Sequence, residues 1–177
     1  MPTNPRDGSQ SDRPARRGVL FVCTGNICRS PLAEAIFRHL ADRRGVAELF
    51  EIESCGTGGW HAGQGADPRT VAVARRYGIP MNHVARTFDA RRDPARFEWI
   101  LAMDRSHQRE VSHVVRPAER VRLIREFDAT LASHPNPDPN HDLDVPDPYY
   151  GAEDGFDEMY HMLDRACRGL LEHLAPR

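Results

Sequence analysis

Apolar stretches alternate with amphipathic stretches along most of the chain. The first, GVLFV at 18–22, is apolar at every position, which is typical of a strand that is buried on both faces of a parallel sheet. Further apolar runs predict strands at 50–54, 97–102 and 120–124. Because these strands alternate with helical patterns, we expect an α/β domain built on a four-stranded parallel sheet.

Helical periodicity follows three of the predicted strands and closes the chain. Ser30 and Pro31 mark the start of the first helix, as N-cap and first helical residue. The other helices are predicted at 69–77, 105–111 and 155–174. Ligands of such sheets bind at the carboxyl ends of the strands, so we expect the loops that follow the strands to form one site.

The length of 177 residues suits a single domain with a buried core. Residues 1–17 are polar and contain Pro, Gly and Ser, which predicts a disordered N-terminal tail before a domain at 18–177. The sequence has no apolar run of about 18 residues, so we expect no membrane partner. The tail lacks the apolar core of a signal peptide, which favours a cytoplasmic protein and leaves unconventional export open.

Charge and composition exclude several classes of protein. The formal net charge is −2, so no overall positive field attracts nucleic acid. All 24 basic residues are arginines, which excludes a Walker A lysine and a Schiff-base lysine. The four cysteines form no Cys-x2-Cys pair, which argues against structural zinc.

The segment CTGNICRS at 23–30 joins the first strand to the first helix. Gly25 permits a positive φ, so successive backbone amides can surround one anion at the helix N-terminus. The same field favours the ionised form of a thiol, which predicts that Cys23 is a nucleophile. Arg29 supplies a planar pair of donors for two oxyanion oxygens. This equipment indicates attack on a phosphate ester, without a metal or another cofactor.

The stretch VLFVCTGNICRSPLAEA, which starts at Val19, resembles the signature of the low-molecular-weight protein tyrosine phosphatases. Three further segments agree with that family in order and spacing: SCGTGGWH at 54–61, DPR at 67–69 and DPYYG at 147–151. The likeness covers nearly the whole chain from Val19 and is strongest to actinobacterial members. It departs from the family in the tail, in a lengthened loop at 131–146 and in Cys55, where a small residue is usual.

The resemblance implies a single-domain, three-layer α/β/α fold of Rossmann-like type. It also implies a protein tyrosine phosphatase in which Cys23 forms a phosphocysteine and Arg29 holds the phosphoryl oxygens. Asp147 would be the general acid and then the base. The neighbouring carboxylates Asp142 and Asp144 are expected to be solvated loop charges.

The remaining expected site residues surround the thiol. Trp60, Tyr149 and Tyr150 would form an aromatic wall that favours a flat, phosphorylated ring. The resemblance places Ser54 and His83 in a hydrogen-bond network behind the loop. Phosphate binding is expected from the loop itself, through Thr24, Gly25, Asn26, Ile27, Cys28 and Ser30.

Three of these loop residues have further expected roles. Asn26 would hold a positive-φ conformation, which asparagine tolerates better than most residues. Ser30 would cap the helix, donate to the thiolate, or do both. Cys28 is either a small buried residue or the partner of Cys23 in a transient disulfide, and the sequence leaves this open.

Three alternatives to a tyrosine phosphatase can be weighed against the sequence. Thr24 is also found in phosphoarginine-specific relatives, so phosphoarginine is the alternative substrate. An arsenate reductase would need two further cysteines on a mobile segment, and residues 80–100 contain none. A catalytically silent phosphotyrosine-binding module would not need Asp147.

This interpretation predicts the chemical class of the binding partners. We expect a protein that carries phosphotyrosine, or another aryl phosphate, as the substrate. Inorganic phosphate would be the product and an inhibitor, and the protein is expected to be a monomer. The physiological substrate cannot be inferred from the sequence.

Overall fold

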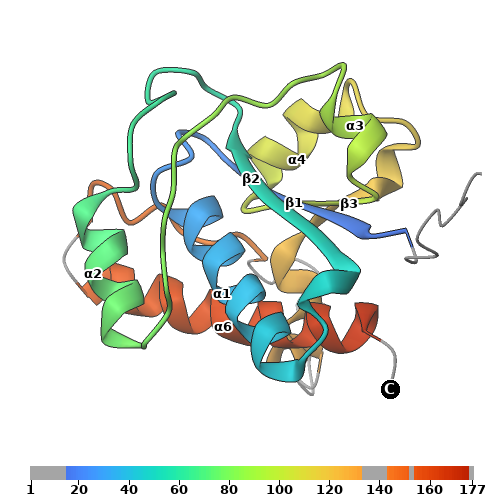
Figure 1. Ribbon diagram of the computed structural model, residues 1–177. Helices are drawn as coiled ribbons and strands as arrows, with labels where there is room; N and C mark the ends of the chain where they lie inside the picture. Colours follow the sequence, from blue (N-terminus) through green and yellow to red (C-terminus); the bar gives the residue numbers. More distant parts are fainter. Residues whose placement is uncertain (1–14, 133–142, 152–153, 176–177) are drawn as a thin grey trace, which may run out of the picture.

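The computed structural model describes residues 15–132, 143–151 and 154–175, which form an α/β domain around a parallel sheet (Figure 1). The sheet has four strands in the order β2-β1-β3-β4. The strands are β1 (Arg17–Cys23), β2 (Phe50–Gly56), β3 (Trp99–Ala102) and β4 (Val121–Leu123). The central strand β1 pairs with β2 and with β3, and all the pairings are parallel. The expected four-stranded parallel sheet is therefore confirmed.

Helices cover both faces of the sheet, which makes the three expected layers (Figure 1). One face carries α1 (Arg29–Arg44), α2 (Pro68–Arg76) and α6 (Asp154–Leu174). The other carries α3 (Asp93–Arg96) and α4 (Arg105–Ser112). The remaining elements are short: η1 (Ala47–Leu49), η2 (Ala118–Arg120), η3 (Ile124–Phe127) and α5 (Ala129–Ala132).

The apolar run of β1 is explained by burial on both sides. Val19 and Phe21 belong to the core beneath α1 and α6, whereas Leu20 and Val22 belong to the core beneath α4. All four side chains are fully buried, and each contributes about 1.5–3 kcal/mol relative to an exposed position. This strand therefore fixes the carboxyl end of the sheet, from which the next loop starts.

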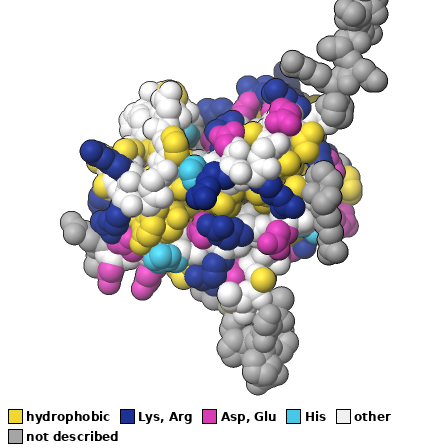
Figure 2. All heavy atoms as spheres, turned by 60° about the horizontal axis from the view of Figure 1, so that its bottom comes forward, with side chains coloured by type: hydrophobic (Ala, Val, Ile, Leu, Met, Phe, Trp, Pro, Cys, Tyr) yellow, Lys and Arg dark blue, Asp and Glu magenta, His cyan; other side chains and the backbone are white. Residues whose placement is uncertain are grey.

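The surface on the α1 and α6 side mixes charges of both signs. Figure 2 shows arginine side chains interspersed with acidic ones on the face that lies at the bottom of Figure 1. Some of these pair within one helix, as Arg168 does with Asp164 in α6. In the described part of the chain, no helix is long and apolar enough to cross a membrane.

The structure corrects several predicted boundaries. Arg17 was assigned to the disordered tail but is the first residue of β1; residues 1–14 lie outside the described part. The fourth strand ends at Leu123 because Ile124 begins a 3₁₀ helix. Ser30 is not the N-cap of α1: the helix already begins at Arg29, with Cys28 at the cap position.

We predict that Gly169→Ala lowers the free energy of unfolding by roughly 1–2 kcal/mol, although alanine is the better helix former. A Cβ at Gly169 in α6 would collide with the carbonyl oxygen of Phe127 in η3, so the two elements would have to separate. Urea denaturation measures the change. Gly155→Ala in the same helix is the control, because its Cβ would lie 3.7 Å from Pro148 at ordinary contact distance. Equal stabilisation of both variants would contradict the close approach.

Candidate active site

A short loop between β1 and α1 forms the floor of the candidate site. β1 ends at Cys23 and α1 begins at Arg29, so residues 24–28 reverse the chain between them. The two residues that follow β2 form hydrogen bonds with this loop. Thr57 N donates to Cys23 O at 2.9 Å, and Gly58 N donates to Thr24 O at 2.9 Å. Gly56 is required at this approach, because a Cβ there would lie 2.5 Å from Thr24 O.

Asn26 adopts the left-handed conformation that the loop requires, with φ 56°. Its side-chain nitrogen donates to the hydroxyls of Ser30 and Ser54, each at 2.9 Å. Its side-chain oxygen accepts from the backbone N of Arg86 at 2.9 Å, and its carbonyl oxygen lies 2.7 Å from His83 Nε2. The network expected of Ser54 and His83 is therefore present in the structure.

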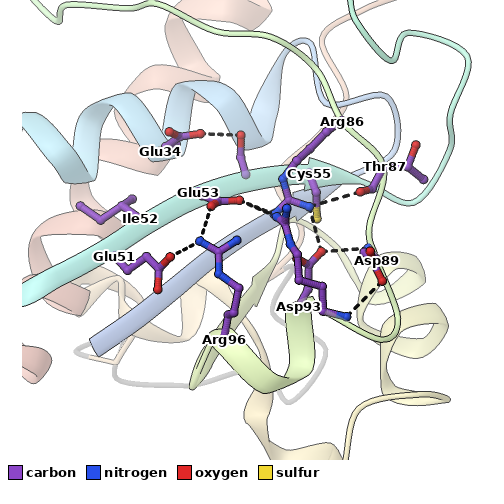
Figure 3. A network of polar contacts seen from close by, with 12 residues as sticks. Glu34, Glu51, Ile52, Glu53, Cys55, Arg86, Thr87, Asp89, Asp93 and Arg96 are labelled. Carbon is purple, nitrogen blue, oxygen red and sulfur yellow. Dashed lines mark hydrogen bonds and ion pairs between the residues drawn. The ribbon is translucent and has the colours of Figure 1, made fainter. Parts of the chain in front are cut away.

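Two members of this supporting network were not predicted from the sequence. Glu34 on α1 accepts a hydrogen bond from the Ser54 hydroxyl at 2.7 Å. Arg86 is held between Glu53 of β2 and Asp93 of α3, with nitrogen–oxygen distances of 2.8 Å to each (Figure 3). Asp93 is fully buried, so its ion pair with Arg86 anchors the segment that bonds to Asn26.

The Cys23 thiol is enclosed by donors from the loop and from α1. Its sulfur lies 3.0 Å from Ser30 Oγ and accepts from the backbone N of Asn26 at 3.3 Å. The Ser30 hydroxyl also lies 3.2 Å from the carbonyl oxygen of Cys55. An ionised thiol has no proton, so Ser30 is the donor when Cys23 is a thiolate. The Ser30 hydroxyl therefore contacts the thiol from the second residue of α1.

Arg29 is buried, and both ends of its guanidinium are occupied by carboxylates. Nη1 donates to Asp104 Oδ2 at 2.8 Å and to Val145 O at 3.1 Å. Nη2 donates to Asp147 Oδ2 at 3.0 Å and lies 3.4 Å from Thr24 Oγ1. The guanidinium is thereby fixed beside the loop, and its role in binding an oxyanion stays a prediction.

Asp104, which contacts Arg29, was not predicted from the sequence as a site residue. It follows β3 and caps α4, accepting hydrogen bonds from the backbone N of Ser106 at 2.8 Å and of His107 at 3.1 Å. Burial alone would raise the pKa of Asp104, but its contacts with His107 and Ser106 outweigh burial and hold that pKa well below the ordinary range. Asp104 is therefore a permanent anion next to Arg29.

The loop and two further segments, one after β2 and one before α6, enclose a cavity of about 230 Å³. The loop side contributes Cys23, Thr24, Gly25, Ile27, Cys28 and Arg29. The opposite wall consists of Trp60, His61, Asp147, Tyr149 and Tyr150. Of the wall residues, only His61 was not predicted as a site residue. Trp60 and Tyr150 are largely exposed, at 70% and 92%, so they stand at the entrance.

Some predicted site residues do not line this cavity. Asn26 and Ser30 are fully buried behind the loop, so their side chains support it instead of facing a ligand. Asp144 is not a solvated charge, because it is half-buried and accepts from the backbone N of Arg105 at 2.9 Å. Asp142 lies outside the described residues.

The cysteines differ in their access to the cavity. Cys23 and Cys28 both line it, and burial raises the pKa of Cys28 to about 12. Cys55 and Cys167 are fully buried elsewhere in the core, where burial raises the pKa of each thiol. A transient disulfide between Cys23 and Cys28 stays one of the two roles predicted for Cys28. Among the described residues, no group of His, Cys, Asp and Glu side chains is arranged to hold a metal ion.

The fold and site define an α/β protein with a thiol-bearing oxyanion loop at the carboxyl edge of a parallel sheet. The family model "Low molecular weight phosphotyrosine protein phosphatase" matches residues 18–177, and the chain belongs to this family.

Relatives with known names agree with this assignment. The chain is 47% identical over 156 residues to the low molecular weight protein-tyrosine-phosphatase of Streptomyces coelicolor, covering 86% of this chain and 90% of that one. It is 40% identical over 158 residues to the human low molecular weight phosphotyrosine protein phosphatase, covering 89% and 96%. Both the family and the actinobacterial likeness expected from the sequence are thus confirmed.

Solved structures share the fold. The crystal structure of YfkJ from Bacillus subtilis aligns with a TM-score of 0.80 at 33% identity, covering 92% of this chain and 96% of that chain. The crystal structure of a drosophila arginine phosphatase aligns with a TM-score of 0.76 at 29% identity, covering 89% and 98%.

We predict that iodoacetamide near neutral pH alkylates Cys23 alone, and that inorganic phosphate slows this reaction. Cys28, Cys55 and Cys167 should be spared, because burial keeps each of them a neutral thiol. Peptide mass spectrometry locates the adduct, and the protein unfolded in urea is the control in which all four cysteines react. Adduct formation at Cys28 in the folded protein would contradict this assignment.

Proposed function

We propose that the chain is a cysteine-dependent, metal-independent phosphatase that hydrolyses phosphotyrosine in proteins through a phosphocysteine intermediate. The observation that carries the proposal is the meeting of Cys23, Arg29 and Asp147 at one cavity, although Asp147 is far from the loop in sequence. The names of the relatives support the same activity.

In the first step, the Cys23 thiolate attacks phosphorus in line with the aryl oxygen. A sulfur–phosphorus bond forms as the bond between phosphorus and the aryl oxygen breaks. The Asp147 carboxyl group donates a proton to the departing phenolate. Arg29 and the loop amides stabilise the charge that spreads over the three equatorial oxygens.

In the second step, water replaces the sulfur. The Asp147 carboxylate now accepts a proton from the attacking water, and the sulfur–phosphorus bond breaks. Inorganic phosphate leaves, and Cys23 returns to the thiolate state. Ser30, 3.0 Å from the sulfur, stabilises that leaving thiolate by donating a hydrogen bond from its hydroxyl group.

The walls of the cavity favour an aromatic substrate. Trp60, Tyr149 and Tyr150 present ring surfaces at the entrance, and the rings of the two tyrosines pack edge to face at 4.9 Å. The thiol is nearly inaccessible at the base, with Cys23 only 3% exposed. A long phosphorylated side chain can therefore reach the nucleophile, whereas phosphoserine is too short.

Phosphoarginine is the second candidate substrate. Thr24 lines the cavity directly after the nucleophile, and one structural relative is named an arginine phosphatase. The test is to measure phosphate release from one peptide that carries phosphotyrosine and from its twin that carries phosphoarginine, with EDTA and a thiol reductant present. Release from the phosphotyrosine peptide is expected to dominate. Preference for phosphoarginine would overturn the proposed substrate, and release from neither would overturn the proposed activity.

Cys23→Ser is expected to abolish turnover, because the hydroxyl of serine is a far weaker nucleophile than a thiolate. The fold and the binding of inorganic phosphate should be retained, since Arg29 and the loop amides remain. Phosphate release and calorimetric phosphate binding test the two halves of this expectation. Residual turnover in the purified variant would remove Cys23 from the nucleophile role.

Asp147→Ala is expected to lower turnover by roughly 10²- to 10⁴-fold, the usual range for a general acid. The loss should shrink for aryl phosphates whose phenols are strongly acidic, because such leaving groups need no proton. A series of substituted phenyl phosphates measures this dependence. Asp144→Ala on the same loop is the matched control and should change turnover little. An equal loss across all leaving groups would contradict the acid role.

A further inference from the structure

We propose that His107 is a positioning residue that fixes Thr24 in the cavity wall and so sets the preference for aryl phosphates. This proposal rests on the proposed phosphatase function. His107 lies in the first turn of α4, is 98% buried and does not line the cavity. Its Nε2 atom lies 2.7 Å from Thr24 Oγ1, which is a full hydrogen bond to the residue that follows the nucleophile.

The contact belongs to a closed ring of four side chains that joins the two ends of the loop between β1 and α1. Thr24 at the start of the loop contacts His107, and Arg29 at its end donates to Asp104 Oδ2 at 2.8 Å. His107 Nδ1 lies 3.0 Å from Asp104 Oδ1, and Arg29 Nη2 lies 3.4 Å from Thr24 Oγ1. The first turn of α4 therefore holds both ends of the loop from behind.

The imidazole has a polar contact at each ring nitrogen although it is buried. Nδ1 lies 3.0 Å from Asp104 Oδ1, and Nε2 lies 2.7 Å from Thr24 Oγ1. An apolar side chain of similar size would fill the same space without either contact. The contact with Thr24 is the one that reaches a residue of the cavity wall.

The effect on substrate choice follows from the branching of threonine. Its χ1 angle has three staggered positions, and each turns a different group toward the cavity. The bond to His107 selects one of them and engages the hydroxyl with a residue outside the cavity. Without His107, the hydroxyl keeps only its longer contact with Arg29 Nη2, at 3.4 Å, and can turn further toward the cavity, where a polar group disfavours an aromatic ring and suits a guanidinium.

The test is His107→Leu, which removes the ring nitrogen that contacts Thr24 while keeping a buried side chain of similar size. The ratio of kcat/KM for the phosphotyrosine peptide to that for its phosphoarginine twin is expected to fall by about tenfold, the worth of one hydrogen bond. The fall should arise in KM, since Cys23 and Asp147 are untouched. His107→Gln should restore most of the ratio, because its amide group can occupy the place of Nε2 and can either donate to the Thr24 hydroxyl or accept from it.

Two further variants separate positioning from general destabilisation. In a Thr24→Val background, His107→Leu should change the ratio no further, because no hydroxyl is left to hold. Val111→Ala, at another buried position of α4, should lower stability without moving the ratio. Additive effects of the two substitutions, failure of glutamine to rescue, or an equal shift in Val111→Ala would each overturn the proposal.

A readout that needs no turnover keeps the two proposals distinguishable. Protection of Cys23 from iodoacetamide by inorganic phosphate reports the loop and Arg29 directly. His107→Leu should weaken this protection severalfold, and the effect should again vanish in the Thr24→Val background. If neither peptide is hydrolysed by the natural chain, the proposed function fails, and this series alone decides whether His107 positions the loop.

Discussion

The site depends on one strained residue being held in place. Asn26 has φ 56°, a conformation that costs roughly 1–3 kcal/mol for a residue with a side chain. The cost is offset by four hydrogen bonds to Asn26 from α1, β2 and the segment after α2. With Asn26 held there, the loop can reverse direction between Cys23 and Arg29 and bring both to one cavity. The chemistry at the front of the loop is thus set by bonds made behind it.

The hydrogen bonds that hold Asn26 depend in turn on contacts at the edge strand β2. The backbone N of Arg86 meets Asn26, while the Arg86 guanidinium bridges Glu53 of β2 and Asp93 of α3 (Figure 3). Asp93 is fully buried, and a buried carboxylate is tolerated only when it is paired. Removing Arg86 would therefore leave Asp93 with one fewer ion pair, since Arg92 still contacts it at 3.1 Å, and would loosen the segment that bonds to Asn26. The ion pairs of Arg86 lie outside the cavity, yet they hold the segment that fixes the backbone of the loop at Asn26.

Much of this could be predicted from sequence because it is local. The apolar run at 18–22 gave the central strand, and the loop after it identified Cys23 and Arg29 by their position between strand and helix. The role of Ser30 was partly misjudged because N-cap preference is also local, whereas its hydroxyl is shared between a thiol and the backbone of β2. Asp104 and His107 were missed since their partners lie more than 70 residues away. One signal was present: Asp104 follows a strand, at the same edge of the sheet as Cys23.

The two carboxylates on Arg29 differ in a way that matters for oxyanion binding. Asp104 caps a helix, is four-fifths buried, and is kept ionised by its donors, so its contact with Nη1 is permanent. Asp147 lies on the cavity wall with its side chain 46% exposed, so solvent screens its pair with the buried Arg29 more strongly than it screens the pair with Asp104. In the proposed mechanism, an entering phosphate therefore displaces Asp147 from Nη2 more readily than it displaces Asp104 from Nη1. Because the guanidinium would keep one carboxylate and exchange the other, the event that binds the oxyanion would also release Asp147 for its proposed role at the leaving group.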